Sequence, residues 1–396
     1  MISSGIDRRA VLAGTVAAVS SGGAAAAGKP SAAEVAAKGM AVTAAGLDPG
    51  SAQDQSERFQ AAVDQAADRR VPLILPAGRY LVGNIQLRPG SRIVAAAAST
   101  VLAYNGKGAF LRAVDCPDIR LDGLEIDGGF LPLGPGGPAA LVMLSRCANA
   151  RLTDVAIRNS DGSGLKLEGV GGAVEGCRIS AVKAAAIFSI DGAGLSVSRN
   201  EISGCQNNGI LIWRSTHGAD TTRVSDNTIS NIAAAQGGTG QNGNGINIYR
   251  AAGVMVAGNR MADCAYSAIR ANEASNVQIA ANQAQRIGEV AIYAEAADER
   301  QGEAGFEGAV IANNLVDTAA AGIVVTNFNN GGRLATVQGN LVRNLFRREQ
   351  EPQDKRGEGI AVEADAVVAN NVVEDAATAG IMIGWTHWMR EVVASS

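Results

Sequence analysis

The sequence of 396 residues is poor in aromatic side chains (4%) and has only two histidines. Its five cysteines form no Cys-x-x-Cys pair, so we expect no metal site and no cofactor. Lysine and arginine form no basic run and the net charge is −4, so nucleic acid is not expected as a partner. No stretch approaches the roughly 18 apolar residues of a transmembrane helix, so no membrane span is expected in the mature protein.

Small and aliphatic residues are abundant instead. Hydrophobic residues make up 47% of the chain, and there are 49 glycines among many alanines, valines and isoleucines. This composition suits thin, repetitive layers better than a bulky globular core. Because each unit of a repeat protein packs mainly on its neighbours, the length of the chain does not require several domains.

Residues 1–27 have the pattern of an export signal. Arg8 and Arg9 precede a short apolar run, and an alanine stretch up to Ala27 offers a cleavage site. Paired arginines before a weakly hydrophobic run resemble the twin-arginine signal, which implies a periplasmic or secreted bacterial protein. A disordered, alanine-rich N-terminus is the alternative. Residues 28–46 are interpreted as a linker.

A repeat occupies most of the chain, and it is marked by one asparagine and one isoleucine in each unit. The asparagines are Asn200, Asn227, Asn259, Asn282, Asn314, Asn340 and Asn371. The isoleucines follow a Gly or Ala and are Ile210, Ile246, Ile269, Ile292, Ile323, Ile360 and Ile381. Val155 and Cys177 take the asparagine place in earlier units, ten residues before Leu165 and Ile187.

A period of about 22 or 23 residues, built from short alternating strands, is too short for a βαβ unit. It predicts an all-β solenoid over residues 91–396: a right-handed, single-stranded parallel β-helix with one coil per repeat and about 4.8 Å between coils. The asparagines are expected to stack into a hydrogen-bonded ladder. A leucine-rich-repeat solenoid has a similar period, but its leucine pattern is absent.

Residues 47–90 are expected to form an N-terminal cap. Asp54–Asp68 has helical periodicity with an apolar face, and Ser56 or Asp54 could cap its start. An apolar strand closing in Pro-Ala-Gly-x-Tyr follows at Pro76–Tyr80. This order resembles the entry to the pectin-lyase-like superfamily, in which the helix covers the open end of the coils. Together with the leader, the chain resembles twin-arginine-exported repeat proteins of that superfamily.

The last coil looks incomplete, because no asparagine strand follows Trp385. Either a partner covers that end or the coding sequence is truncated. Cys205 and Cys264 each lie five residues after a ladder asparagine and are expected to point inward. Cys116 and Cys147 are expected to stack in neighbouring coils, where packed thiols are favoured over a disulfide.

Five insertions border the isoleucine strands and could form the walls of a groove along them. The alternative is neutral sequence variation in surface loops. The insertions are Arg214–Thr222, Ala233–Asn244, Ala297–Gly308, Asn327–Arg333 and Arg347–Glu358. His217 lies in one of them, and His387 lies in the final coil. Both histidines are interpreted as ordinary surface residues rather than general bases.

If each isoleucine points inward, the first and third residues after it form two outward columns. In the middle coils these columns are predicted to gather polar and aromatic side chains suited to sugar binding. The predicted substrate-binding residues are Trp213, Arg214, Asn247, Tyr249, Arg250, Asn272, Glu273 and Glu363.

Arg270, Tyr293 and Glu295 are the predicted catalytic residues. Arg270 could neutralise a uronate carboxylate while Tyr293 removes a proton, as a lyase requires. Glu295 and Glu363 lie two coils apart, about 9.6 Å, at the wide limit for an inverting hydrolase. The calcium-binding aspartates of pectate lyases, the aspartate pairs of polygalacturonases and the Asp-Pro-His of alginate epimerases are not visible.

Two functions therefore compete. The first is a lyase or hydrolase of acidic polysaccharide, and the second is a non-catalytic periplasmic protein that binds glycan or supports the envelope. A role in assembly or maturation is a third possibility. The polysaccharide or cell-envelope glycan that would be bound, and the oligomeric state, are not determined by the sequence, because the fold alone specifies no reaction.

Overall fold

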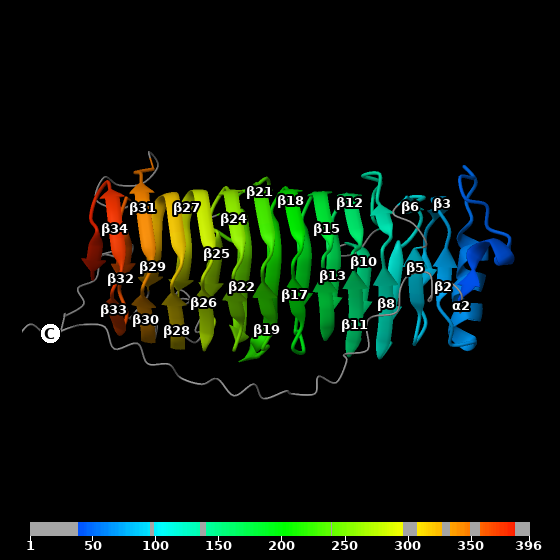
Figure 1. The fold of residues 1–396 in the computed structure, drawn as a ribbon, viewed down its shortest axis with the longest axis horizontal. Helices are drawn as coiled ribbons and strands as arrows, with labels where there is room; N and C mark the ends of the chain where they lie inside the picture. Colours follow the sequence, from blue (N-terminus) through cyan, green and yellow to red (C-terminus); the bar gives the residue numbers. More distant parts are fainter. Residues whose placement is uncertain are drawn as a thin grey trace, which may run out of the picture.

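The computed structural model describes residues 39–95, 99–134, 140–238, 240–295, 307–326, 333–348 and 357–384. These residues form an elongated stack of coils, with the N-terminal segment at one end and β33–β35 at the other (Figure 1). The predicted signal peptide, most of the three later insertions, His387 and the end of the last coil lie outside the described residues.

Three columns of parallel strands run along the stack. Column A is the 13-stranded sheet. Its strands are β1 (Met40–Ala41), β2 (Leu73–Leu75), β5 (Arg92–Ala95), β8 (Asp118–Asp122), β11 (Asn149–Thr153), β14 (Gly172–Glu175), β17 (Ser196–Ser198), β20 (Arg223–Ser225), β23 (Met255–Ala257), β26 (Val277–Ala280), β28 (Glu307–Ala312), β30 (Arg333–Gln338) and β33 (Ala366–Ala369).

Column B follows the ladder asparagines and belongs to the 22-stranded sheet. Its strands are β3 (Gly78–Val82), β6 (Thr100–Tyr104), β9 (Glu125–Asp127), β12 (Ala156–Ser160), β15 (Arg178–Val182), β18 (Glu201–Cys205), β21 (Thr228–Ile232), β24 (Arg260–Cys264), the first parts of β27 (Gln283–Glu295) and β29 (Leu315–Thr326), β31 (Leu341–Leu345) and β34 (Val372–Ala376).

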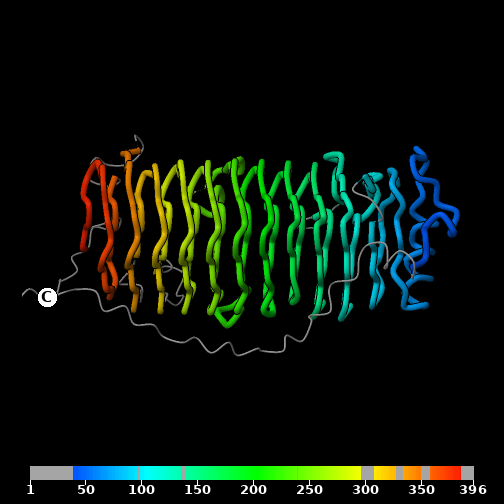
Figure 2. The backbone as a smooth tube through the Cα atoms, viewed as in Figure 1, coloured from blue at the N-terminus to red at the C-terminus, as the bar shows by residue number. Residues whose placement is uncertain are grey.

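Column C carries the repeat isoleucines and completes the same sheet. Its strands are β4 (Ile85–Gln86), β7 (Leu111–Val114), β10 (Ala140–Ser145), β13 (Ser163–Glu168), β16 (Ala185–Ile190), β19 (Asn208–Ala219), β22 (Asn244–Ala252), β25 (Ile269–Asn272), the last parts of β27 and β29, β32 (Ile360–Val362) and β35 (Ile381–Ile383). The backbone trace shows the coils lying one above another, as the repeat predicts (Figure 2).

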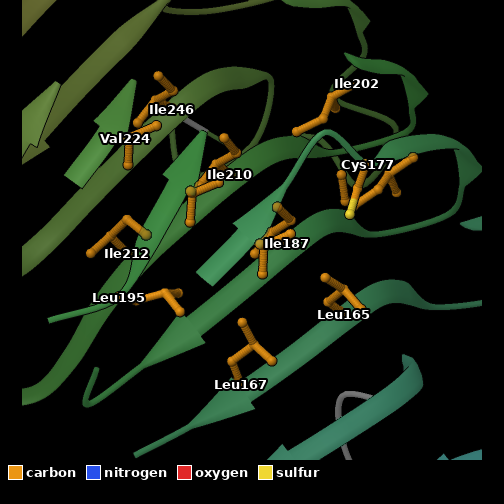
Figure 3. Close-up of a cluster of buried hydrophobic side chains, with 14 of the residues drawn as sticks. Leu165, Leu167, Cys177, Ile187, Leu195, Ile202, Ile210, Ile212, Val224 and Ile246 are labelled. Carbon is orange, nitrogen blue, oxygen red and sulfur yellow. The ribbon is translucent and has the colours of Figure 1, made fainter. Parts of the chain in front are cut away.

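The register between coils is the one that the repeat predicts. Ile187 pairs with Ile210, which pairs with Ile246, and the series continues to Ile381. These isoleucines are buried up to Ile360. Figure 3 shows Ile187, Ile210 and Ile246 among other buried aliphatic side chains of successive coils. A slip of one residue would turn each isoleucine to the outer face, so burial of the aliphatic column fixes the register.

The asparagine ladder is also confirmed. Asn259 Nδ2 donates to Asn282 Oδ1 at 3.0 Å, and Asn282 Nδ2 donates to Asn314 Oδ1 at 3.0 Å. Each side-chain oxygen also accepts a backbone N–H from the coil before it, as in the 3.0 Å bond from Asn227 to Asn259. The ladder runs from Asn200 to Asn371. It satisfies buried backbone groups at a corner where the strands end.

The predicted helix forms at the N-terminal end of the stack (Figure 1). After a 3₁₀ turn, η1 (Val42–Ala45), the helix α2 spans Ser56–Asp68 and buries the predicted face of Phe59, Ala62, Val63 and Ala66. Asp54 accepts the backbone N–H of Ser56 at 3.0 Å, which satisfies a free donor of the first turn.

The cysteines of the chain are all free and buried, which confirms the preference for packed thiols. Burial raises the pKa of Cys177, Cys205 and Cys264 to about 12. These side chains therefore remain neutral and serve as small core residues.

Candidate functional site

The outer face of column C contains the predicted columns in the predicted order. Trp213 pairs with Tyr249, Tyr249 with Asn272, and Asn272 with Glu295. Asn247 pairs with Arg270, and Arg270 with Tyr293. The structure therefore brings the predicted side chains of the middle coils together on one face.

An aromatic ladder, defined here as Phe188, Trp213 and Tyr249, follows the axis of the stack. The ring centroids of Phe188 and Trp213 are 5.2 Å apart, and those of Trp213 and Tyr249 are 5.6 Å apart, both with edge-to-face geometry. All three side chains are half-buried. The indole N–H of Trp213 donates to Asn247 Oδ1 at 2.9 Å, which fixes the orientation of the ring.

Arg270 and Glu295 form an ion pair beside this ladder. Arg270 Nη2 lies 2.6 Å from Glu295 Oε1, which also accepts a hydrogen bond from Asn272 Nδ2 at 2.7 Å. Burial lowers the pKa of Arg270, but the charge of Glu295 and the other acidic groups near it outweigh this effect and leave the pKa above its ordinary value. The guanidinium also covers the ring of Tyr293 at 5.1 Å. Arg270 therefore contacts both of the other predicted catalytic residues.

A second cluster surrounds the buried carboxylate of Glu273. Glu273 Oε2 accepts from Arg250 Nε at 2.9 Å and lies 2.9 Å from Nε2 of His217. Arg250 and Glu273 occupy the same corner of adjacent coils with left-handed backbone (φ 56° and 50°). Arg250 also lies over the ring of Tyr249 at 4.7 Å. Burial, and then the charge of Glu273, raise the pKa of Tyr249.

Two further predicted residues lie at the edges of this face. Glu363 is buried two coils beyond Glu295, with Thr326 in the coil between them. The hydroxyl of Thr326 is buried and has no hydrogen-bond partner. Arg214 donates from Nη1 to the carbonyl of Ala219, within its own insertion, at 2.9 Å.

The prediction that these columns face open solvent is wrong for several residues. The buried ones are Asn247, Glu273, Tyr293, Glu295 and Glu363. The physical reason is that long side chains of this face pair across coils, as Arg270 does with Glu295 over Tyr293. In addition, Gly240 of the Ala233–Asn244 insertion lies so close to the Arg270 guanidinium that a Cβ there would overlap it.

His217, Phe188 and Glu289 belong to this face but were not predicted as site residues. Phe188 lies one coil before Leu211 in the outward column. An aromatic residue at an outward position of the repeat could therefore have identified it from the sequence. The contact of His217 with Glu273 depends on how its insertion folds, and no repeat position encodes that. Glu289 lies 3.5 Å from Arg348, an interaction between two distant segments that leaves no sequence pattern.

A shallow groove of about 270 Å³ lies on column B. It is lined mainly by Thr228, Ser230, Arg260, Gln283 and Asp317. It contains no aromatic side chain, unlike the face of column C.

These coils and columns define a protein with the right-handed parallel β-helix fold. Residues 217–387 match the family model of the right-handed β-helix region, and residues 136–283 match the model described as periplasmic copper-binding protein (NosD). A comparison with curated proteins gave no match.

Solved structures with a similar fold are only distantly related in sequence. The A-module of mannuronan C-5 epimerase AlgE4 from Azotobacter vinelandii has a TM-score of 0.57 and 14% identity, over 90% of this chain and 100% of that one. The exopolygalacturonase of Thermotoga maritima has a TM-score of 0.57 and 13% identity, over 87% and 95%. A GH87 α-1,3-glucanase from Streptomyces thermodiastaticus has a TM-score of 0.57 and 16% identity, over 90% and 66%.

The described residues do not fit a copper site. They include no group of three or more histidine, cysteine, aspartate or glutamate side chains placed to hold a metal ion. Copper in proteins is bound by thiolate, thioether and imidazole groups. Burial keeps thiols such as Cys205 protonated, with a pKa of about 12, and the imidazole of His217 already contacts Glu273.

Within the part of the chain that the structure covers, no helix has the length and apolar character needed to cross a bilayer.

Proposed function

We propose that this chain is an exported protein that binds a polysaccharide along the outer face of column C, with the aromatic ladder as the main contact. The single observation that carries this proposal is the alignment of the half-buried rings of Phe188, Trp213 and Tyr249 along the stack. Asn247 holds the central ring, that of Trp213, through a hydrogen bond. Aromatic rings offer apolar surface to the C–H faces of sugars, while amide and charged groups beside them bind hydroxyls.

The comparisons support this reading at the level of the fold. The similar structures are named as an epimerase of mannuronan, a polygalacturonase and a glucanase, all of which act on polysaccharides. The twin-arginine pattern at Arg8 and Arg9 and the periplasmic description of one matched family both favour export to the periplasm or beyond.

Catalysis is the second candidate. Glu295 and Glu363, two coils and therefore about 9.6 Å apart, could act as acid and base of an inverting hydrolase. The unpartnered hydroxyl of Thr326 lies in the coil between them. A lyase acting on acidic polysaccharide, with Arg270 and Tyr293, would first have to separate Arg270 from Glu295. Binding without cleavage is therefore the function we favour.

The test is glycan binding by the mature protein on an array, followed by affinity measurement for the best ligand and a search for cleavage products. We expect Trp213→Ala to weaken binding about tenfold or more, since it removes an aromatic contact of about 1 kcal/mol together with buried apolar area. Phe130→Ala is the matched control, because Phe130 is exposed and lies outside the aromatic ladder.

Equal losses in the two variants would overturn the aromatic ladder as the binding site. If products form, Glu295→Gln and Glu363→Gln should each abolish them while leaving binding intact. Product formation that survives both substitutions would exclude the hydrolytic pair.

A further inference from the structure

We infer that the polysaccharide bound on this face is uncharged rather than a polyuronate. This inference rests on the proposed function and names the substrate class of the same site. A polyuronate carries a carboxylate on each sugar, so its binding needs basic side chains with free hydrogen-bond donors at the contact surface.

Apart from Arg214, the basic side chains next to the aromatic ladder are already paired with carboxylates. Arg250 binds Glu273 at 2.9 Å, and Arg270 binds Glu295 at 2.6 Å. Further along the face, Arg348 lies 3.5 Å from Glu289. Lys166, beside Phe188 in the adjacent coil, lies 3.9 Å from Glu168.

The pairs of Arg250 and Arg270 are too shielded to exchange partners readily. The side chains of Arg250 and Arg270 are only 18% and 12% exposed, and those of Glu273 and Glu295 are 3% and 7% exposed. Taking an arginine from such a pair leaves a buried carboxylate without compensation, which is strongly unfavourable. A substrate carboxylate would have to supply that energy before it gained anything.

Both guanidinium groups also contact an aromatic ring, and Nη1 of Arg270, which has no hydrogen-bond partner, is buried next to Gly240. Arg250 lies over the ring of Tyr249 at 4.7 Å, and Arg270 lies over the ring of Tyr293 at 5.1 Å. Each arginine therefore contacts an aromatic ring as well as a glutamate. Arg214, the remaining basic side chain near the ladder, donates to its own insertion at the carbonyl of Ala219.

In the described coils from β13 to β32, which contain the aromatic ladder, the charge on this face is acidic on balance. The basic side chains are Lys166, Arg214, Arg250, Arg270 and Arg348. The acidic side chains are Glu168, Glu273, Glu289, Glu295, Glu358 and Glu363. A polyanion would meet net repulsion here, whereas sugar hydroxyl groups can donate to an exposed carboxylate such as that of Glu168.

The experiment compares two neutral polysaccharides, a glucan and a mannan, with two polyuronates, alginate and polygalacturonate. Binding to the full mature protein is measured at low and at physiological salt. We expect a neutral polysaccharide to bind with an affinity that salt changes little, and the polyuronates to bind at least tenfold more weakly.

Variants that remove the carboxylate partner of a basic side chain test the inference more directly. Glu273→Gln removes the partner of Arg250 and should strengthen polyuronate binding about tenfold. Glu168→Gln does the same for Lys166 at a more exposed position, so it remains informative if the first variant folds poorly. Asp115→Asn is the control, because it frees Arg146 at the same corner of earlier coils, away from the aromatic ladder.

Stronger, salt-sensitive binding of the polyuronates by the unaltered protein would overturn the inference while leaving the proposed function intact. Absence of binding to all four polysaccharides and to the glycan array would overturn the proposed function itself. An equal gain in Asp115→Asn and Glu273→Gln would show that net charge, rather than the freed Arg250, controls polyuronate binding, and would contradict the inference.

Discussion

Asp54 connects the capping helix to the first coils through both oxygens of its carboxylate. Oδ1 accepts the backbone N–H of Ser56 at 3.0 Å, and Oδ2 accepts from Lys107 Nζ at 3.0 Å. The side chain of Ser56 in turn accepts the backbone N–H of Gly83 at 2.9 Å. One charged side chain thereby orders the start of α2 and its contact with the strands below.

This arrangement makes the stability of the cap depend on pH. The hydrogen bonds from Ser56, and then Lys107, lower the pKa of Asp54 below its ordinary value of 3.8. Because the folded pKa is the lower one, the stabilisation is present above about pH 4 and is lost as the pH falls and the carboxyl group protonates. Asp54→Ala should cost about 1 kcal/mol of unfolding free energy at pH 7, and the difference from the unaltered protein should shrink below pH 4.

Urea unfolding at pH 7 and below pH 4 measures the difference in unfolding free energy between Asp54→Ala and the unaltered protein. Asp68→Ala, at the opposite end of the same helix, is the control, and we expect it to change stability by less than about 0.5 kcal/mol at either pH. A cost in Asp54→Ala that does not depend on pH would show that the carboxylate charge is not what matters.

At the scale of elements, the asparagine ladder joins each coil to the next. Asn259 accepts the backbone N–H and the side-chain amide of Asn227, and it donates to Asn282 and to the carbonyl of Val224. All of these groups are buried, so they have no water to replace a lost partner.

Asn259→Ala should therefore lower the unfolding free energy by about 3 kcal/mol, because several buried polar groups lose a partner worth about 1–3 kcal/mol each. Chemical denaturation measures the loss. Asn149→Ala is the control: Asn149 is only half-buried, lies outside the ladder, and donates to Asp118 at 3.1 Å. We expect it to cost less than about 1 kcal/mol, and equal losses would contradict a special role for the ladder.

The same elements explain what could be predicted from the sequence. The register from Ile187 to Ile381 was predictable, because a strand alternates its side chains with a period of two and the aliphatic residues must be inside. The burial of Glu295 and Tyr293 was not, because it depends on pairing across coils and on the position of Gly240. The repeat determines the position of each residue within its coil. The contacts that its side chain makes depend on the insertions, which follow no repeat.

At the scale of the whole molecule, each coil contacts mainly the coil before it and the coil after it. The pairings of column C run only between neighbouring coils, from β4 to β35. Stability in such a stack is close to a sum of contributions from single coils and their interfaces. The aromatic ladder and the coil of Arg270 and Asn272 are consequently separable parts of the site.

Deleting residues 260–282 removes one coil, β24 to β26, and joins Asn259 to Gln283. The inward and outward faces stay in phase, and Asn259 takes the place of Asn282 beside Asn314. We expect a folded, shorter protein with unchanged β-sheet content per residue by circular dichroism and a lower unfolding temperature. Phe188 and Trp213 lie in earlier coils, so glycan binding should be weakened but retained.

Deleting residues 260–271 is the matched control for this experiment. It removes β24 and all of β25 except Asn272 but leaves β26, so Asn259 would be followed by a column A strand where column B is required. We expect this shorter deletion to be far more destabilising than the longer one, since it leaves the strands of the neighbouring coils without partners and exposes their core. If the two deletions lowered the unfolding temperature equally, the coil would not be the unit from which the stability of this stack is built.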